Sequence, residues 1–411
     1  RGTVTDAENG EPLPGVNVLA KGTTSGTVSN ADGEFSLTVA DNVTTLVFSS
    51  IGYNSQEVDI NGRNTIAVNL APDIKALSEV VVVGYGTQKR SDLTGSVASV
   101  SGEELDKLPI TTVEQGLQGR AAGVQVTQAD ASPGGAVSVR IRGGNSINFS
   151  NEPLYVVDGF PTDNIASLNP NDIASMEVLK DASATAIYGA RGANGVVIIT
   201  TRQGKVGVST LDFNMFVGSQ EITNKIPLLN GVQYAELANE AYIQDGRDAP
   251  FPDPQALGEG TDWQDAVYRT APIQNYQLAF TKGNKDTRYA ITANYFNQDG
   301  IIINSNFERY SFRFNLDSDI NERLTLGNNL AFSFIDNNEV LVNSGGTGGA
   351  GVAHNALTVT PDLPIYDSLG NYFVNWQQIG PGFRRDNPVS LAEDVTNNTK
   401  SGRFLGNFFV N

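Results

Sequence analysis

The chain has 411 residues and a net charge of −18, from 45 acidic and 27 basic residues. Binding to duplex nucleic acid needs clusters of lysine and arginine, which this sequence lacks, so no nucleic-acid partner is expected. The absence of cysteine and the single histidine, His354, exclude disulfides, thiolate metal sites and histidine-rich metal sites. We expect no catalytic site, no metal and no cofactor. No apolar run approaches the roughly 18 residues that a membrane helix requires.

Residues 1–71 predict a small β-sandwich. Short strand-like segments are separated by turn signals such as Asp32-Gly33. Many short strands with regular turns are typical of two packed sheets. At Asp32-Gly33, a hairpin turn with Gly33 at positive φ is favoured over a calcium-binding loop. The expected strands cover residues 3–4, 16–19, 27–28, 34–38, 45–49 and 66–70.

Residues 72–95 predict a linker that carries a run of four valines. The run consists of Val80, Val81, Val82 and Val83, and Glu79 precedes it. Consecutive β-branched residues favour an extended chain. Two interpretations remain open from the local sequence: a buried strand of a neighbouring domain, or an exposed strand that is donated to the sheet edge of a partner.

Residues 96–205 predict a compact domain of mixed α and β structure with no evident catalytic centre. A short helix is expected at 102–108, where Pro109 ends it. Thr111 and Glu114 form the pattern of a capping box, which predicts a second helix that ends near Gln118. An alanine-rich helix is expected at 182–188. The expected strands cover residues 124–127, 137–141, 154–157, 175–179 and 195–201.

Residues 206–411 contain six segments in which apolar and polar residues alternate with period two. This alternation predicts antiparallel strands with one apolar and one polar face. Short connections at 283–286 and 318–323 alternate with longer ones. Outer-membrane barrels have tight periplasmic turns and long extracellular loops, so a transmembrane β-barrel is favoured over a soluble sandwich. The segments cover residues 211–217, 276–280, 289–295, 310–316, 324–334 and 404–410.

Several motifs occur in the order found in one known family. They are PLPGV (12–16), DGEF (32–35), FSSIGY (48–53), EVVVVGYGTQ (79–88), LQGRAAGV (117–124), VRIRG (139–143), PLYVVDG (153–159), the stretch 173–201 and TDWQ (261–264). The first three resemble a carboxypeptidase-regulatory-like N-terminal extension, the fourth resembles a TonB box, and the next four resemble a plug domain. Together they resemble the SusC-like (starch-utilisation-type) TonB-dependent outer-membrane transporters.

The resemblance implies a mainly β protein that imports a large solute across the outer membrane of a Gram-negative bacterium. The solute would be a glycan, an oligosaccharide or a peptide. Implied partners are TonB with ExbB-ExbD, a SusD-like surface lipoprotein that lids the barrel, and outer-membrane lipid. The N-terminal domain and TonB box would be periplasmic. The implied domains are a carboxypeptidase-regulatory-like β-sandwich (1–71), a linker with the TonB box (72–95), a plug (96–205) and the first part of a transmembrane barrel with long extracellular loops (206–411).

The resemblance also implies roles for particular residues. The TonB box, Glu79 to Val83, would add as a strand to the C-terminal sheet of TonB. The tryptophans Trp263 and Trp376 would lie in long loops, where they stack on sugar or, as the favoured alternative, pack within the loops or against the lid. Four plug arginines would contact acidic residues inside the barrel, with salt bridges on the plug surface as the alternative: Arg120, Arg140, Arg142 and Arg191.

Six strands cannot close a barrel around a plug. The family uses about 22 strands, because a plugged lumen needs a wide barrel, and an open sheet edge in lipid leaves backbone groups unsatisfied. We therefore expect these residues to be the front of a longer protein, from which a signal peptide has been lost. Three weaker interpretations are a dinucleotide site at the GxGxxG of 346–351, which lacks a βαβ unit, a secreted adhesin, and a signalling receptor.

Overall fold

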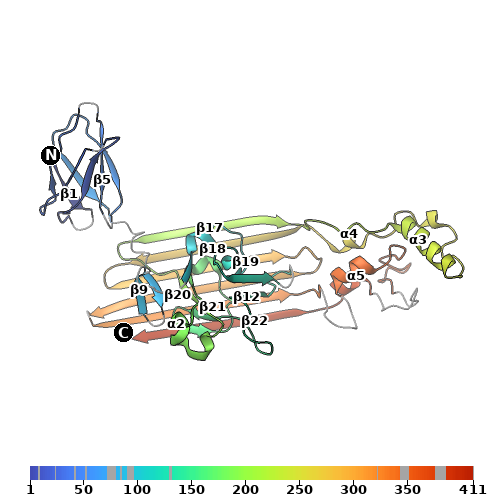
Figure 1. Ribbon diagram of the computed structural model, residues 1–411. Helices are drawn as coiled ribbons and strands as arrows, with labels where there is room; N and C mark the ends of the chain where they lie inside the picture. Colours follow the sequence, from blue (N-terminus) through green and yellow to red (C-terminus); the bar gives the residue numbers. More distant parts are fainter. Residues whose placement is uncertain are drawn as a thin grey trace. The chain divides into compact units, whose positions relative to one another are not determined.

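The computed structural model describes residues 1–7, 10–23, 25–40, 43–50, 53–71, 80–83, 86–89, 97–128, 132–321, 323–342, 351–374 and 386–410. These residues fall into two compact units, Arg1–Thr94 and Gly95–Asn411, which are treated separately below (Figure 1). No helix within the described ranges is both long and apolar enough to cross a membrane.

The first unit contains a β-sandwich, as the turn spacing predicts. One sheet has the order β4-β1-β7 and the other β3-β2-β5-β6. Alternate residues of the strands point inward, and Phe35 and Phe48 pack edge to face with ring centroids 5.3 Å apart. The strands are β1 (Gly2–Asp6), β2 (Asn17–Ala20), β3 (Gly26–Val28), β4 (Glu34–Phe35), β5 (Thr45–Ser49), β6 (Gln56–Asp59) and β7 (Ile66–Leu70).

Two details of the sandwich differ from the prediction. Gly33 has φ +72°, as expected, but the turn joins β3 to β4, which belong to different sheets, so it is not a hairpin. A Cβ at Gly33 would lie 2.5 Å from the carbonyl oxygen of Val4, which also requires glycine there. The edge strand β6 was not predicted, because its sequence, QEVD, has a single apolar residue to mark it.

The second unit begins with a middle domain, defined here as residues 97–205. Its five-stranded sheet has the order β10-β15-β16-β13-β14, and a separate hairpin pairs β11 with β12. Among its described residues, sixteen buried hydrophobic side chains form the core, including Leu117, Met176 and Ile199. The strands are β10 (Val97–Ser101), β11 (Val124–Gln128), β12 (Val137–Ile141), β13 (Leu154–Val157), β14 (Phe160–Thr162), β15 (Ile173–Leu179) and β16 (Val196–Thr201).

The expected capping box at Thr111 and Glu114 is wrong. The segment forms a short 3-10 helix, η3 (Glu114–Leu117), whose N-cap is Val113 and has no side-chain cap. The N–H of Thr111 instead donates to Oε1 of Gln115, at 2.9 Å. The side chain of Glu114 is buried, and it interacts with its own backbone amide and with Thr112. A capping box does occur at the start of α1 (Gly102–Leu105), between Ser101 and Glu104.

The alanine-rich helix is shorter than predicted. α2 (Ala182–Thr185) passes into the 3-10 segment η5 (Ala186–Gly192), and Gly189 lies within η5 at φ 58° and ψ −146°. A left-handed glycine inside the segment breaks the α-helix, since the helical repeat requires negative φ throughout.

The rest of the second unit is built on one long antiparallel sheet, in which the strands pair in sequence order from β17 to β22. The six predicted segments are therefore confirmed as strands. The connection 300–305, expected among the longer ones, is short because β19 and β20 extend well beyond their apolar segments. The strands are β17 (Ser209–Gln220), β18 (Ala271–Gly283), β19 (Thr287–Asp299), β20 (Asn306–Asn321), β21 (Leu324–Asn338) and β22 (Asn398–Val410).

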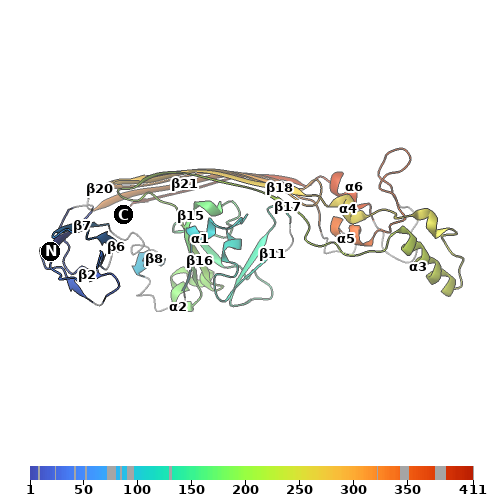
Figure 2. The ribbon, with the colours of Figure 1, turned by 90° about the horizontal axis from the view of Figure 1, so that it is seen from above.

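The long sheet has two chemically different faces because its register keeps like residues together. One row across all six strands joins Phe213, Leu278, Ala293, Phe312, Phe332 and Phe404. The five large residues of this row are exposed. The neighbouring row on the other face is polar from β17 to β22, and the middle domain lies against this polar face (Figure 2). The polar row joins Asn214, Gln277, Asn294, Ser311, Ser333 and Arg403.

The helices of the two long connections gather beyond one end of the long sheet (Figures 1 and 2). A third apolar cluster forms there around Trp263, Val352 and Val389. The helices are α3 (Gly231–Gln244), η6 (Pro254–Leu257), α4 (Trp263–Val267), α5 (Val352–Thr358) and α6 (Pro388–Glu393).

Candidate functional site

A buried arginine of β20 fixes the middle domain against the long sheet. Arg309 is 1% exposed. Its Nη1 donates to the carbonyl oxygens of Thr111 and Leu168, at 3.3 and 3.2 Å. The guanidinium carbon lies 5.4 Å from the ring centroid of Phe296 on β19. The side chain therefore satisfies backbone carbonyls of the middle domain while it packs on an aromatic ring of the sheet.

A second arginine, four residues further along β20 on the same face, forms ion pairs with the middle domain. Nη1 of Arg313 lies 3.4 Å from Oδ2 of Asp158, and its Nε lies 3.7 Å from Oδ2 of Asp172. All three side chains are at most 6% exposed. Asp158 is also held inside its own domain, where it accepts hydrogen bonds from the N–H and hydroxyl of Thr201, at 2.9 and 2.8 Å.

Neutral amides complete this interface. Nε2 of Gln277, on β18, donates to the carbonyl oxygen of Asn171 and to Oδ1 of Asp172, each at 3.2 Å. Nδ2 of Asn315, on β20, donates to the carbonyl oxygen of Arg202 at 2.8 Å. The sheet thus presents mostly donors, and the middle domain presents carbonyl and carboxylate acceptors.

Burial affects the carboxylates at this interface. It raises the pKa of Asp172, and the charge of Arg313 opposes that shift. Burial also raises the pKa of Glu114, although its own backbone amide and Thr112 favour the charged form. A buried charge is stable only with its partners in place, because removal of one partner leaves an uncompensated ion, which costs about 3–5 kcal/mol.

The four plug arginines of the sequence analysis lie elsewhere. All four are exposed, and the described contacts place none of them against the long sheet. Arg142 pairs with Asp181 at 2.6 Å and Arg191 with Asp163 at 3.3 Å, both within the middle domain. Nη1 of Arg120 donates to the carbonyl oxygen of Gln118 at 3.2 Å. The fourth arginine, Arg140, is exposed on β12. Their expected contacts with acidic barrel residues stay a prediction.

The described interface has a different arrangement of charges from those expected contacts, because its arginines belong to β20 and its carboxylates to the middle domain. The sequence did contain a pattern that indicates these β20 contacts. On the polar face of the strand, the period-two positions are Arg309, Ser311, Arg313 and Asn315. A basic residue at such a position indicates a buried acceptor opposite it.

The predicted coupling segment forms part of a hairpin. β8 (Val80–Val83) pairs antiparallel with β9 (Gly86–Lys89), with Val80 opposite Lys89 and Val83 opposite Gly86. Within the described residues this pair belongs to no larger sheet. Glu79 lies outside the described residues. An isolated two-stranded hairpin is marginally stable in water, and the role of the valine segment in coupling stays a prediction.

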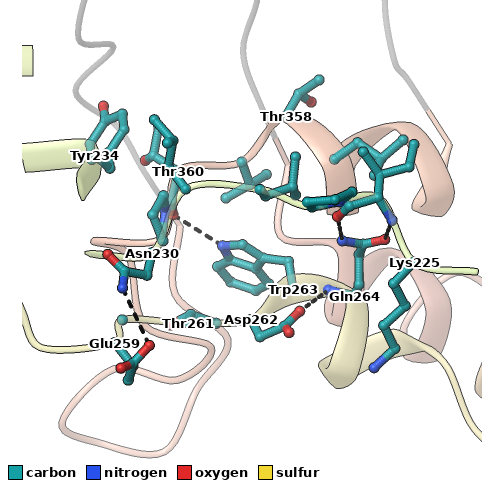
Figure 3. A pocket seen from close by; sticks show the side chains of 18 residues that line it. Lys225, Asn230, Tyr234, Glu259, Thr261, Asp262, Trp263, Gln264, Thr358 and Thr360 are labelled. Carbon is teal, nitrogen blue, oxygen red and sulfur yellow. Dashed lines mark hydrogen bonds between the residues drawn. The ribbon is translucent and has the colours of Figure 1, made fainter. Parts of the chain in front are cut away.

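A pocket of about 590 Å³ lies among the helices beyond the sheet (Figure 3). Trp263 lies against it but is only 3% exposed, and its Nε1 donates to the carbonyl oxygen of Thr360 at 3.0 Å. Stacking on a sugar needs an exposed indole face, which Trp263 does not offer. Trp376 lies outside the described residues. Among the residues that the structure describes, no group of His, Cys, Asp and Glu could hold a metal ion.

Comparison with known proteins covers the whole chain. Residues 1–82 match the CarboxypepD_reg-like domain, and residues 89–196 match the TonB-dependent Receptor Plug Domain. The TonB-dependent receptor P3 of Formosa agariphila is 44% identical over 100% of this chain and 40% of that protein. The TonB-dependent receptor SusC of Bacteroides thetaiotaomicron is 35% identical over 100% of this chain and 42% of that protein.

A solved structure of the RagAB peptide importer in its open-open state is 33% identical, with a TM-score of 0.68, over 80% of this chain and 40% of that chain. The chain has the domains and the fold of a SusC-like TonB-dependent receptor. The middle domain corresponds to the plug, and the long sheet to the first strands of the barrel. The relatives are named as receptors and importers rather than as enzymes. This chain spans about 40% of the length of the curated relatives.

Proposed function

We propose that the chain is the front of an outer-membrane importer that moves a large solute with energy supplied through TonB. The observation that carries the proposal is the buried polar contact between Arg313 of β20 and the plug carboxylates of Asp158 and Asp172. The plug is held on the polar face of the sheet by charges that water can also solvate. Such a contact positions a plug and can still be separated by a mechanical pull.

Energy would reach the plug through the valine segment. The outer membrane has no ATP, so the work is done from the periplasm by TonB with ExbB-ExbD. Glu79 to Val83 would add as a strand to a sheet of TonB, where main-chain hydrogen bonds carry the load and β-branched side chains favour extension. The N-terminal sandwich and this segment would then be periplasmic.

The cargo and the lid belong to the same proposal. The resemblance to SusC-like transporters implies a large cargo, a glycan, an oligosaccharide or a peptide, and a SusD-like surface lipoprotein over the barrel. The similarity to SusC and to the RagAB peptide importer supports this assignment. The apolar outer face of the long sheet would contact outer-membrane lipid. Tyr276, Tyr295 and Tyr310 have their rings in contact across adjacent strands on that face, as the residues of aromatic girdles do.

The decisive experiment changes the coupling segment in the full-length receptor. Deletion of residues 79–83 is expected to abolish uptake of labelled cargo and to leave binding at the cell surface intact. A matched pair sharpens the test. Val81→Pro removes a main-chain donor and should also abolish uptake, whereas Val81→Ile keeps the donor and the β-branch and should support it. Uptake that persists after the deletion would contradict the proposal.

A further inference from the structure

One wall of the Figure 3 pocket is the segment 225–230, which precedes α3. Three of its large apolar residues, Ile226, Leu228 and Leu229, are 53%, 48% and 45% exposed. Single exposed apolar residues are ordinary, but several that gather at a pocket mark an interaction site. A pocket of about 590 Å³ is within the range of sites that hold ligands.

The segment is held in place by the side chain of Gln264 in α4. Nε2 of Gln264 donates to the carbonyl oxygen of Ile226 at 2.7 Å, and the N–H of Ile226 donates to Oε1 of Gln264 at 3.0 Å. Two bonds to one residue reproduce the pairing of an antiparallel strand. Pro227 supports the same conformation, because a residue that precedes proline favours an extended backbone. Gln264 is 4% exposed, so packing fixes the side chain that makes these two hydrogen bonds.

The next peptide groups are left without a partner. In the part of the chain that the structure describes, no hydrogen bond engages the N–H or C=O of Leu228 or Leu229, whereas the N–H of Asn230 donates to Gln233 at 3.1 Å. An ordered segment with free main-chain donors and acceptors is a template for an added extended chain. The apolar side chains beside it would contact alternate side chains of that added chain.

The chemistry of the pocket favours a peptide over an oligosaccharide. Sugar sites present exposed aromatic faces, but Trp263 is buried and Tyr234 is only partly exposed. The charged lining consists of the carboxylates of Glu259 and Asp262 and the ammonium group of Lys225, so acidic groups are in excess. The whole connection 221–270 carries nine acidic residues against three basic ones. Charge complementarity therefore favours a ligand with cationic groups.

We propose that this pocket binds an extended peptide that combines apolar and basic side chains, with its main chain paired to Leu228 and Leu229. Import of the bound peptide as cargo rests on the proposed function. Binding itself needs no TonB, since every contact invoked lies within this loop region. Gln264 would act as a positioning residue, because it orients the segment without touching the peptide.

The test measures fluorescence anisotropy of a labelled peptide of alternating leucine and lysine with the purified full-length receptor, free of its lipoprotein. Leu228→Asp and Leu229→Asp replace exposed residues, so both variants should fold, and each is expected to weaken binding by about tenfold or more. The matched control is Leu237→Asp, on α3. Leu237 is 55% exposed and does not line the pocket, so this variant should bind as the unchanged receptor does.

A second arm tests the main-chain pairing on the unchanged receptor. The same peptide with alternate N-methyl groups keeps its side chains but loses donors, and it should bind about tenfold more weakly. A matching peptide of leucine and glutamate should also bind weakly. Equal binding of the methylated peptide, equal binding by Leu228→Asp, or a linear glucose oligosaccharide that displaces the peptide would each overturn the proposal.

Uptake of the peptide is measured separately from its binding. In the receptor without residues 79–83, peptide binding should persist while uptake is lost. If uptake persists there, the coupling proposal fails although the binding result stands. If Leu228→Asp instead releases the surface lipoprotein from the receptor and the peptide does not bind, the pocket is a docking surface for a protein, and the peptide site is wrong.

Discussion

The plug is held together and held in place by different kinds of interaction. Its described interior contains sixteen buried hydrophobic residues, and burial of each valine, leucine, isoleucine or methionine among them contributes about 1.5–3 kcal/mol relative to exposure. Its contact with the long sheet includes arginines, carboxylates and amides that are paired across the interface. The two regions are equally dry, with Ile199 and Arg309 both at most 1% exposed, so burial alone does not distinguish them.

The difference lies in what each region gains from water after separation. Apolar core residues lose their stabilisation when they are exposed. Arg313 and Asp172 regain hydration, which offsets most of the attraction they had in the interface. The plug should therefore separate from the sheet at a lower free energy than it unfolds. This ordering is what a plug that is displaced by pulling requires.

The largest expected effect comes from a change in the interior. Ile199 is fully buried in β16, and Ile199→Ala should lower the free energy of unfolding of the plug by about 3 kcal/mol, through lost transfer energy and a cavity. Differential scanning calorimetry of the full-length receptor, or protease susceptibility of the plug, measures it. Ile187→Ala is a matched control, because Ile187 is 51% exposed and its change should cost little.

A smaller effect is expected at the interface. Arg313→Met leaves two carboxylates without their cation, a loss of about 3–5 kcal/mol if they stayed buried. The plug can instead loosen and admit water, so about 2 kcal/mol is expected, seen as increased entry of large antibiotics into cells while the core stays folded. Adding Asp172→Asn should recover part of the loss. Additive effects of the two changes would show that they do not interact.

Much of the fold follows from local patterns in the sequence. Period-two alternation locates all six strands of the long sheet, since each strand has one exposed apolar face and one polar face. Short apolar runs also locate the plug strands β11, β12, β13, β15 and β16, but they did not predict β10 or β14. The pattern does not predict β6, whose residues are polar, or the 3-10 form of η3, where the burial of Glu114 overrides a local capping signal.

The interface was harder to predict than the strands. Its partners are far apart in sequence, with Arg313 and Asp158 separated by 155 positions. Alternation of polar and apolar residues predicts a polar face but does not identify the residues that cover it. For Trp263, the sequence left sugar stacking and loop packing open and favoured packing. The buried cluster formed with α4, α5 and α6 shows that the indole is covered.

The smallest predicted effect concerns Glu114, at the boundary of core and interface. Burial raises its pKa above the usual 4.5, so the folded plug favours the protonated form. The favourable contribution is present below the unfolded pKa and is lost as the pH rises through the folded pKa. Glu114→Gln keeps the shape without the charge. The variant should unfold at a higher temperature than the unchanged protein at pH 7, and the two should converge near pH 4. A variant that is less stable at pH 7 would mean that the charge of Glu114 is needed beside Arg309, and that core and interface form one network.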